Sequence, residues 1–231
     1  MPSVLVTGAS RGFGRELTEV YRSRGWTLSP LVRDPRAAAA WAGTDGCHPI
    51  RADVGVAGVE DAIRDVLEAH TSALDLLVNN AGGIRKLRWL AATTSEDVEE
   101  AFRVHCLGAF RCTRAALPFL RRAARPTVVN VTSRFGSIAG AVAGEFRGIY
   151  SYSIAKCAQN MLTACLDREL RQEGVRVLAV HPGRLKTEVA ATDADTEPRV
   201  AAERLADWLE SAERDSDCRL HDLMGGGVIP W

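Results

Sequence analysis

The chain has 231 residues, 46% of them hydrophobic and 25% charged, and its 29 basic residues balance its 29 acidic ones. This length fits one large α/β domain with a substantial core. This balance leaves no excess of basic residues that would indicate binding to nucleic acid or to an anionic membrane. No apolar run approaches the roughly 20 residues that span a bilayer. The first residues enter a strand-like run without a preceding basic segment, which is unlike a signal peptide.

The expected elements alternate between strands and helices along the chain. Strands are predicted at 4–7, 27–32, 48–51, 74–78, 127–131 and 175–180, with a last one within 219–224. Helices are predicted at 14–24, 58–70, 95–123, 152–172 and 198–212. This alternation indicates a doubly wound, mostly parallel sheet of about seven strands with helices on both faces, in a single domain covering residues 1–231.

Six cysteines are scattered along the chain. None forms a Cys-x-x-Cys pair, and no histidine clusters with them at metal-ligand spacing, so we expect no metal site. Reduced, packed thiols are typical of a cytoplasmic protein, which is the location that we expect. The six are Cys47, Cys106, Cys112, Cys157, Cys165 and Cys218.

A glycine-rich turn at residues 7–14, Thr-Gly-Ala-Ser-Arg-Gly-Phe-Gly, follows the first strand and opens the first helix. Glycines allow a tight turn and close backbone approach to a pyrophosphate, which then lies at the helix N-terminus. The alternative is an ordinary glycine-containing turn, which the surrounding strand–turn–helix pattern disfavours.

The glycine spacing and five later motifs, in the same order, resemble the short-chain dehydrogenase/reductase family. The later motifs are Asp53-Val54, Asn79-Asn80-Ala81-Gly82, Ser133, Tyr152-x-x-x-Lys156 and Pro182-Gly183 followed by Thr187. The resemblance implies a Rossmann fold and a nicotinamide cofactor. The cofactor contacts that it implies are Gly8, Ser10, Arg11, Gly12, Phe13, Gly14, Arg33, Asp53, Val54, Asn80, Ala81, Gly82, Tyr152, Lys156, Pro182, Gly183, Leu185 and Thr187.

The residues after the second strand favour NADP(H) over NAD(H). An acidic residue there usually holds the ribose 2′-hydroxyl, whereas an arginine accommodates a 2′-phosphate. Val32 occupies the position of the acidic residue, Arg33 follows it, and Arg11 is a second basic residue that relatives use for this phosphate. In the alternative, Arg33 is solvated and Asp34 takes the ribose.

Tyr152 and Lys156 are one helical turn apart on one face. A free phenol has a pKa near 10, and we expect the lysine ammonium to lower it so that Tyr152 can exchange a proton with the substrate oxygen. By resemblance, Lys156 also holds the nicotinamide ribose. The hydroxyl of Ser133 would orient the substrate oxygen.

Two features depart from the family pattern. His105 stands where relatives carry an asparagine that helps to hold a water linking the lysine to solvent. A histidine could replace this relay or abolish it, and we expect an altered relay with His105 as a fourth catalytic residue. The gap between Ser133 and Tyr152 is also long. Together with the segments 31–35 and 227–231, it resembles the sniffer-like and C-factor-like carbonyl reductases.

The predicted function is NADPH-dependent reduction of a ketone or aldehyde, or oxidation of the alcohol. The alternatives are an epimerase or dehydratase on the same fold and a non-catalytic NADP-sensing interaction protein. Loops near 83–90, 134–150 and 185–198 should border the substrate, the last as a polar lid. Arg85, Lys86, Arg88 and Arg134 either attract an anionic substrate or acidic carrier, or are solvated. A homodimer or homotetramer is expected through the helices at 95–123 and 152–172.

Overall fold

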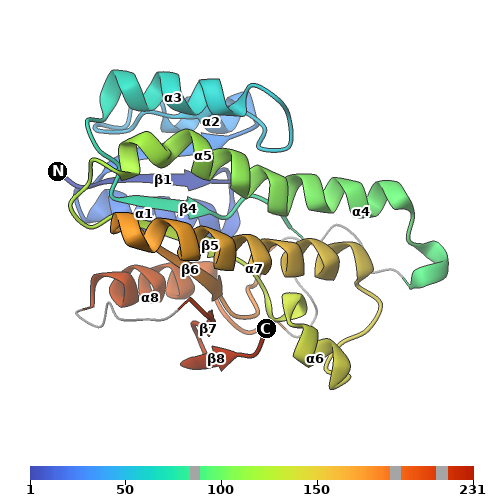
Figure 1. The fold of residues 1–231 in the computed structure, drawn as a ribbon. Coiled ribbons are helices and arrows are strands. Elements are labelled where there is room, and N and C mark those ends of the chain that lie inside the picture. Colours follow the sequence, from blue (N-terminus) through green and yellow to red (C-terminus); the bar gives the residue numbers. More distant parts are fainter. Residues whose placement is uncertain (84–88, 188–193, 212–217) are drawn as a thin grey trace.

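A computed structural model describes residues 1–83, 89–187, 194–211 and 218–231. Within these ranges one sheet holds eight strands in the order β3-β2-β1-β4-β5-β6-β7-β8, all parallel except β8, which runs antiparallel to β7 (Figure 1). The strands are β1 Ser3–Thr7, β2 Thr27–Val32, β3 Ile50–Arg51, β4 Leu76–Asn79, β5 Thr127–Val131, β6 Arg176–His181, β7 Leu220–Asp222 and β8 Gly227–Ile229. The predicted fold class is confirmed.

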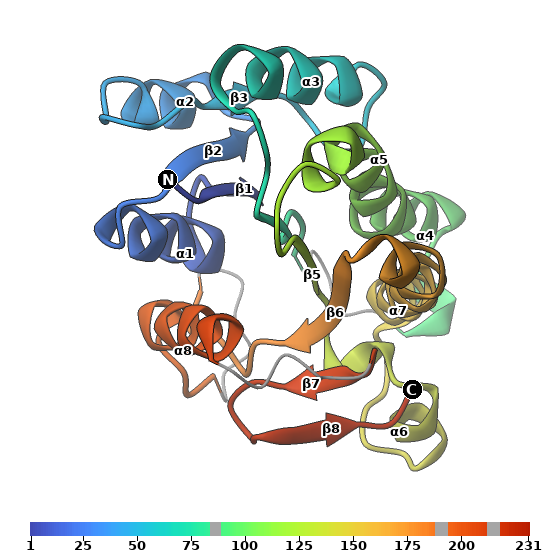
Figure 2. The ribbon, with the colours of Figure 1, turned by 60° about the vertical axis from the view of Figure 1, so that its left-hand side comes forward.

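Helices cover both faces of this sheet. Figure 2 shows α1 and α8 on one face and α3, α5 and α7 on the other. The α-helices are α1 Gly12–Ser23, α2 Pro35–Trp41, α3 Val59–His70, α4 Ser95–Phe102, α5 Gly108–Leu120, α6 Ile138–Val142, α7 Tyr150–Leu170 and α8 Pro198–Glu210. Short 3₁₀ turns occur at Leu90–Ala92, Arg134–Gly136 and Arg171–Glu173. None of the helices described here is long and apolar enough to cross a bilayer.

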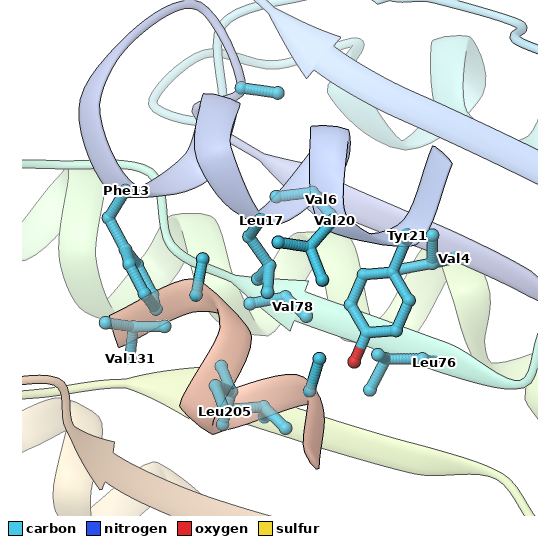
Figure 3. Close-up of a cluster of buried hydrophobic side chains, with 14 of the residues drawn as sticks. Val4, Val6, Phe13, Leu17, Val20, Tyr21, Leu76, Val78, Val131 and Leu205 are labelled. Carbon is cyan, nitrogen blue, oxygen red and sulfur yellow. The ribbon is translucent and has the colours of Figure 1, made fainter. Parts of the chain in front are cut away.

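Alternating strand residues contribute side chains to two separate hydrophobic cores, because successive side chains point to opposite faces of a sheet. Val4 and Val6 pack toward α1 and α8, whereas Leu5 between them packs toward α3 and α5. Figure 3 shows the first core, in which Leu17 of α1 and Leu205 of α8 lie together over the strands. The strands are therefore apolar on both faces, as expected for a covered parallel sheet.

The last strand, predicted within 219–224, is confirmed as β7, and the structure adds a further strand after it. β7 ends at Asp222, whose carboxylate accepts a hydrogen bond from the backbone N–H of Gly225 at 3.0 Å. The following glycines turn the chain back, and β8 adds an eighth strand where about seven were predicted. This turn was missed because three glycines in a row give no strand or helix period.

Two further helical features differ from the prediction. The segment 134–150, predicted to be a loop, contains α6, which the Ser137 hydroxyl caps by accepting from Gly140 N at 2.9 Å. The helix predicted over 95–123 is divided by one π-helical turn, Arg103–Leu107. Such turns often occur at functional sites, and this one carries His105.

Candidate active site

The glycine-rich turn lies at the carboxyl ends of β1, β2 and β4, fixed by backbone hydrogen bonds. Gly8 N donates to Leu31 O at 2.9 Å. The Thr7 hydroxyl accepts from Asn80 N at 2.9 Å and from Ala81 N at 3.0 Å, and the Asn80 amide donates to Thr7 O at 2.9 Å. Thr7 fixes the turn against the segment after β4, a structural role that sequence reasoning missed. Its signal is a hydroxyl at the last residue of the first strand.

The glycines of this turn pack so closely against neighbouring atoms that a side chain at these positions would not fit. A Cβ atom at Gly14 would lie 2.4 Å from both the Asn80 amide nitrogen and Gly8 O. Among the described residues, no side chain caps the N-terminus of α1. The first N–H groups of a helix need a partner and favour an anion. The turn and α1 therefore fit a pyrophosphate. Phe13 is buried in the core, so only its backbone could contribute, whereas Ser10 is exposed.

The adenosine end of the expected site lies beside β2. Arg33 is exposed and its guanidinium lies 3.3 Å from the carboxylate of Asp53. Asp34 accepts from Arg36 N at 2.8 Å and caps α2. Since this carboxylate already serves as a helix cap, the alternative in which Asp34 holds the ribose is disfavoured. Val54 is buried nearby.

The segment after β6 is the expected nicotinamide end of the site. A Cβ atom at Gly12 would lie 3.4 Å from the Thr187 methyl group, so this segment reaches the phosphate turn. It is held by an isolated bridge between Leu185 and Thr196, with Lys186 N donating to Thr196 O at 2.9 Å. Pro182 and Gly183 lie between this bridge and β6. The predicted lid and charged loop fall partly on 188–193 and 84–88, the latter carrying Arg85, Lys86 and Arg88, which lie outside the described residues.

Ser133, Tyr152 and Lys156 come from the end of β5 and the first turns of α7. The ammonium of Lys156 donates to Val131 O at 2.7 Å and lies 5.6 Å from the centroid of the Tyr152 ring. The Ser133 hydroxyl accepts from Phe135 N at 3.3 Å and also hydrogen-bonds to Tyr152. The structure therefore brings the three expected side chains together.

Burial dominates the electrostatics of this cluster. It raises the pKa of Tyr152 to about 12, only partly offset by the hydrogen bond to Ser133, and it lowers the pKa of Lys156 to about 7. The expectation that Lys156 lowers the pKa of Tyr152 is thus wrong for the protein alone, because desolvation of the phenolate outweighs the nearby ammonium. Tyr152 is a protonated phenol at neutral pH, suited to giving a proton.

His105 lies directly against Tyr152. It is buried, its ring meets the Tyr152 ring edge-on with centroids 5.2 Å apart, and its Nε2 atom is 3.3 Å from Gly83 O. A Cβ atom at Gly82 would lie 2.1 Å from the imidazole, so a side chain there would displace it. The π-helical turn thus places His105 in the wall of the site, between the segment after β4 and the tyrosine.

Gln159 is a further site residue that sequence reasoning missed. Its side-chain carbonyl accepts from Lys156 Nζ at 2.9 Å. The signal was available, since residues three apart share one helical face. Gln159 and His105 line a small pocket behind the site that has no volume for a water molecule. Gln159 therefore takes up one of the three N–H groups of the Lys156 ammonium.

The comparisons with known proteins agree with this geometry. The family model for short chain dehydrogenase matches residues 2–198. C-signal of Myxococcus xanthus is 32% identical over 161 residues, covering 70% of this chain and 95% of that protein. NADPH-bound carbonyl reductase from chicken fatty liver superposes with a TM-score of 0.90 at 26% identity, covering 100% of this chain and 99% of the other.

Carbonyl reductase Sniffer of Drosophila melanogaster also superposes with a TM-score of 0.90, at 22% identity and full coverage of both chains, which shows the shared fold. The expected resemblance to the sniffer-like and C-factor-like branch is confirmed. The chain belongs to the short-chain dehydrogenase/reductase family of nicotinamide-dependent oxidoreductases.

Proposed function

We propose that the protein is an NADPH-dependent reductase of a ketone or aldehyde. The observation that carries this proposal is the buried cluster in which Ser133 hydrogen-bonds a protonated Tyr152 beside Lys156. Reduction of a carbonyl requires a proton at its oxygen, and a phenol that burial keeps protonated can supply it.

In this mechanism the Ser133 hydroxyl donates to the substrate oxygen and orients it, and Tyr152 transfers its proton to that oxygen. Lys156 has three N–H groups, two of which are taken by Val131 O and Gln159. The third remains for the nicotinamide ribose. Bound at the turn and the segment after β6, the cofactor supplies the hydride.

The preference for NADP(H) rests on the charge around the adenosine end. Arg33 is exposed beside Asp53 and Arg11 directly precedes α1, so we assign the binding of a 2′-phosphate to these two guanidinium groups. A guanidinium offers charge-assisted, bidentate bonds to phosphate. The chicken carbonyl reductase of the same fold was crystallised with NADPH, which supports this choice.

The proposal extends to assembly and location. All six cysteines are free, as expected in a reducing cytoplasm. A homodimer or homotetramer would use the outer surfaces of α4, α5 and α7. Exposed apolar side chains on these helices, Phe102, Phe110, Ile154 and Met161, favour such packing.

The test is NADPH oxidation, followed by its absorbance, against a panel of ketones, aldehydes and β-keto thioesters. Replacement Tyr152→Phe removes the proton donor, and we expect kcat to fall by about 10²- to 10⁴-fold with NADPH binding retained. Tyr21→Phe, which removes a hydroxyl buried in the core between α1 and α8, is the matched control. Bound NADPH that no carbonyl in the panel oxidises would contradict the proposal.

A further inference from the structure

The face of α7 that carries Tyr152 and Lys156 continues one turn further, to Asn160. Side chains four residues apart lie on the same face of a helix, and these three follow one another at that interval. The Asn160 side chain is buried, with only 4% of the residue exposed. A buried amide that lacks hydrogen-bond partners costs free energy. The contacts of this amide therefore show what it contributes to the site.

The Asn160 amide binds the turn that follows Ser133. Its Nδ2 atom donates to Gly136 O at 3.1 Å, and both residues are buried. Its Oδ1 atom has no hydrogen-bond partner in the part of the chain that the structure describes. An apolar side chain of similar size would avoid this unpaired oxygen. The contact with Gly136 is therefore what an amide provides here and a leucine would not.

The turn packs tightly against α7 at this point. A Cβ atom at Gly136 would lie 2.8 Å from the backbone carbonyl carbon of Lys156 and 2.9 Å from the Asn160 Nδ2 atom. Gly136 N donates to Ser133 O at 2.9 Å, which closes the single 3₁₀ turn between these two residues. Because the turn is so short, a shift of Gly136 along the helix would also shift Ser133.

Ser133 is thus fixed on both sides by one face of α7. Before it in the chain, Val131 O accepts from the ammonium of Lys156 at 2.7 Å. After it, Gly136 O accepts from the amide of Asn160. These two helical side chains therefore bracket the segment that presents the Ser133 hydroxyl.

We propose that Asn160 is a positioning residue for carbonyl reduction: by holding Gly136 O, it keeps the Ser133 hydroxyl within hydrogen-bonding distance of Tyr152. The proposal rests on the proposed function and deepens it by adding a residue that acts through Ser133. The Ser133 hydroxyl accepts from Phe135 N inside the same turn at 3.3 Å and hydrogen-bonds to Tyr152. Loss of the Asn160 amide should therefore affect catalysis only while the Ser133 hydroxyl is present.

The kinetic test is a double-mutant cycle of Asn160→Leu and Ser133→Ala, with NADPH oxidation as the readout. Asn160→Leu should lower kcat by about tenfold to a hundredfold and leave the Kd of NADPH unchanged, because a misplacement of about 1 Å can cost about 10²-fold in rate. In the Ser133→Ala protein it should lower kcat by less than about twofold more. Thr163→Val, which removes another buried hydrogen bond of α7, is the control and should leave kcat unchanged.

Equal losses of kcat with and without the Ser133 hydroxyl would overturn the inference, because Asn160 would then act on the fold as a whole. A rise in the Kd of NADPH as large as the fall in kcat would also overturn it. The proposed function would stand in both cases, since the wild-type protein would still reduce the carbonyl. Asn160→Ala also removes the donor and replaces the leucine variant if that variant does not fold.

A spectroscopic measurement tests the same hydrogen bond without turnover. The chain has three tyrosines, so the signals of ¹³C-labelled tyrosine can be assigned with Tyr152→Phe. Asn160→Leu should move the Tyr152 Cζ signal in the same direction as Ser133→Ala does, because both variants weaken the hydrogen bond to the phenol. A Tyr152 signal that Asn160→Leu leaves in place would overturn the inference. If the signal moves as expected but the wild-type protein reduces no carbonyl, the proposed function alone is rejected.

Discussion

The two halves of the active-site edge are built by different means. At the ends of β1, β2 and β4, the half expected to hold the pyrophosphate is fixed by closely packed glycines and by hydrogen bonds among the backbone, the buried Thr7 hydroxyl and the Asn80 amide. At the ends of β6 and β7, the half expected to border the nicotinamide and the substrate has one backbone bridge and exposed side-chain pairs such as Lys186 with Glu197. The first half leaves little room for substitution, whereas exposed side chains in the second half can change without disturbing the fold.

The largest loss of NADPH affinity and stability is expected from adding one methyl group to the glycine-rich turn. Gly14→Ala would place a carbon 2.4 Å from Gly8 O and the Asn80 amide. The turn must move, so we expect NADPH binding to weaken by at least about tenfold and the protein to lose about 1–3 kcal/mol of stability. Fluorescence titration and thermal melts measure both. Gly227→Ala, where no atom lies within 4 Å, should change neither NADPH affinity nor stability. If Gly14→Ala leaves NADPH affinity unchanged, the glycine-rich half is not as closely packed as the comparison of the two halves requires.

A smaller and more selective effect is expected at Arg33. Its guanidinium is exposed beside Asp53, so Arg33→Ala should not unfold the protein. We expect the Kd of NADPH to rise about tenfold to a hundredfold, and the Kd of NADH to stay the same, because only NADPH carries the 2′-phosphate. Arg36→Ala, on the exposed part of α2, is the control. Equal changes in the Kd values of NADPH and NADH would show that Arg33 does not bind the 2′-phosphate.

Gln159→Leu should shift the pH dependence of kcat. The Gln159 carbonyl accepts a hydrogen bond from the Lys156 ammonium and favours its charged form, so its loss should lower the pKa of Lys156 further below about 7. If the ammonium is the active form, activity is lost as pH rises through this pKa. The alkaline limb of kcat should then move to lower pH by about half a unit or more. Met161→Leu, exposed on α7, is the control; an unmoved limb would make Gln159 purely structural.

The smallest effect is expected for His105→Asn, which restores the residue type usual in the family. Because Gln159 already contacts Lys156, we expect a change of only a few-fold in kcat. The pH dependence of kcat from pH 5 to 8 measures this. An identical rate and profile would make His105 a bystander in proton transfer.

Sequence patterns were sufficient for the parts of the molecule that depend on local rules. The alternation of strands and helices and the glycine turn follow from side-chain period and backbone sterics. The pKa values of Tyr152 and Lys156 did not follow, because burial comes from the packing of segments far apart in sequence. For the same reason the contact between the His105 and Tyr152 rings was not visible in the sequence, although His105 was expected at the site.

One buried feature of the sheet also constrains how the chain assembles. The Asn79 amide donates to the Asn130 side chain on the neighbouring strand at 2.9 Å, and Asn130 donates in turn to the Thr163 hydroxyl at 2.9 Å. If β4 slid past β5 by one residue, the two amides would no longer face one another, and one would turn into the apolar core under α1 and α8. An unpaired amide there costs about 1–3 kcal/mol. The pair therefore disfavours a misaligned β4–β5 register during folding. Replacing both asparagines with valine would add apolar burial but remove this preference for the correct register.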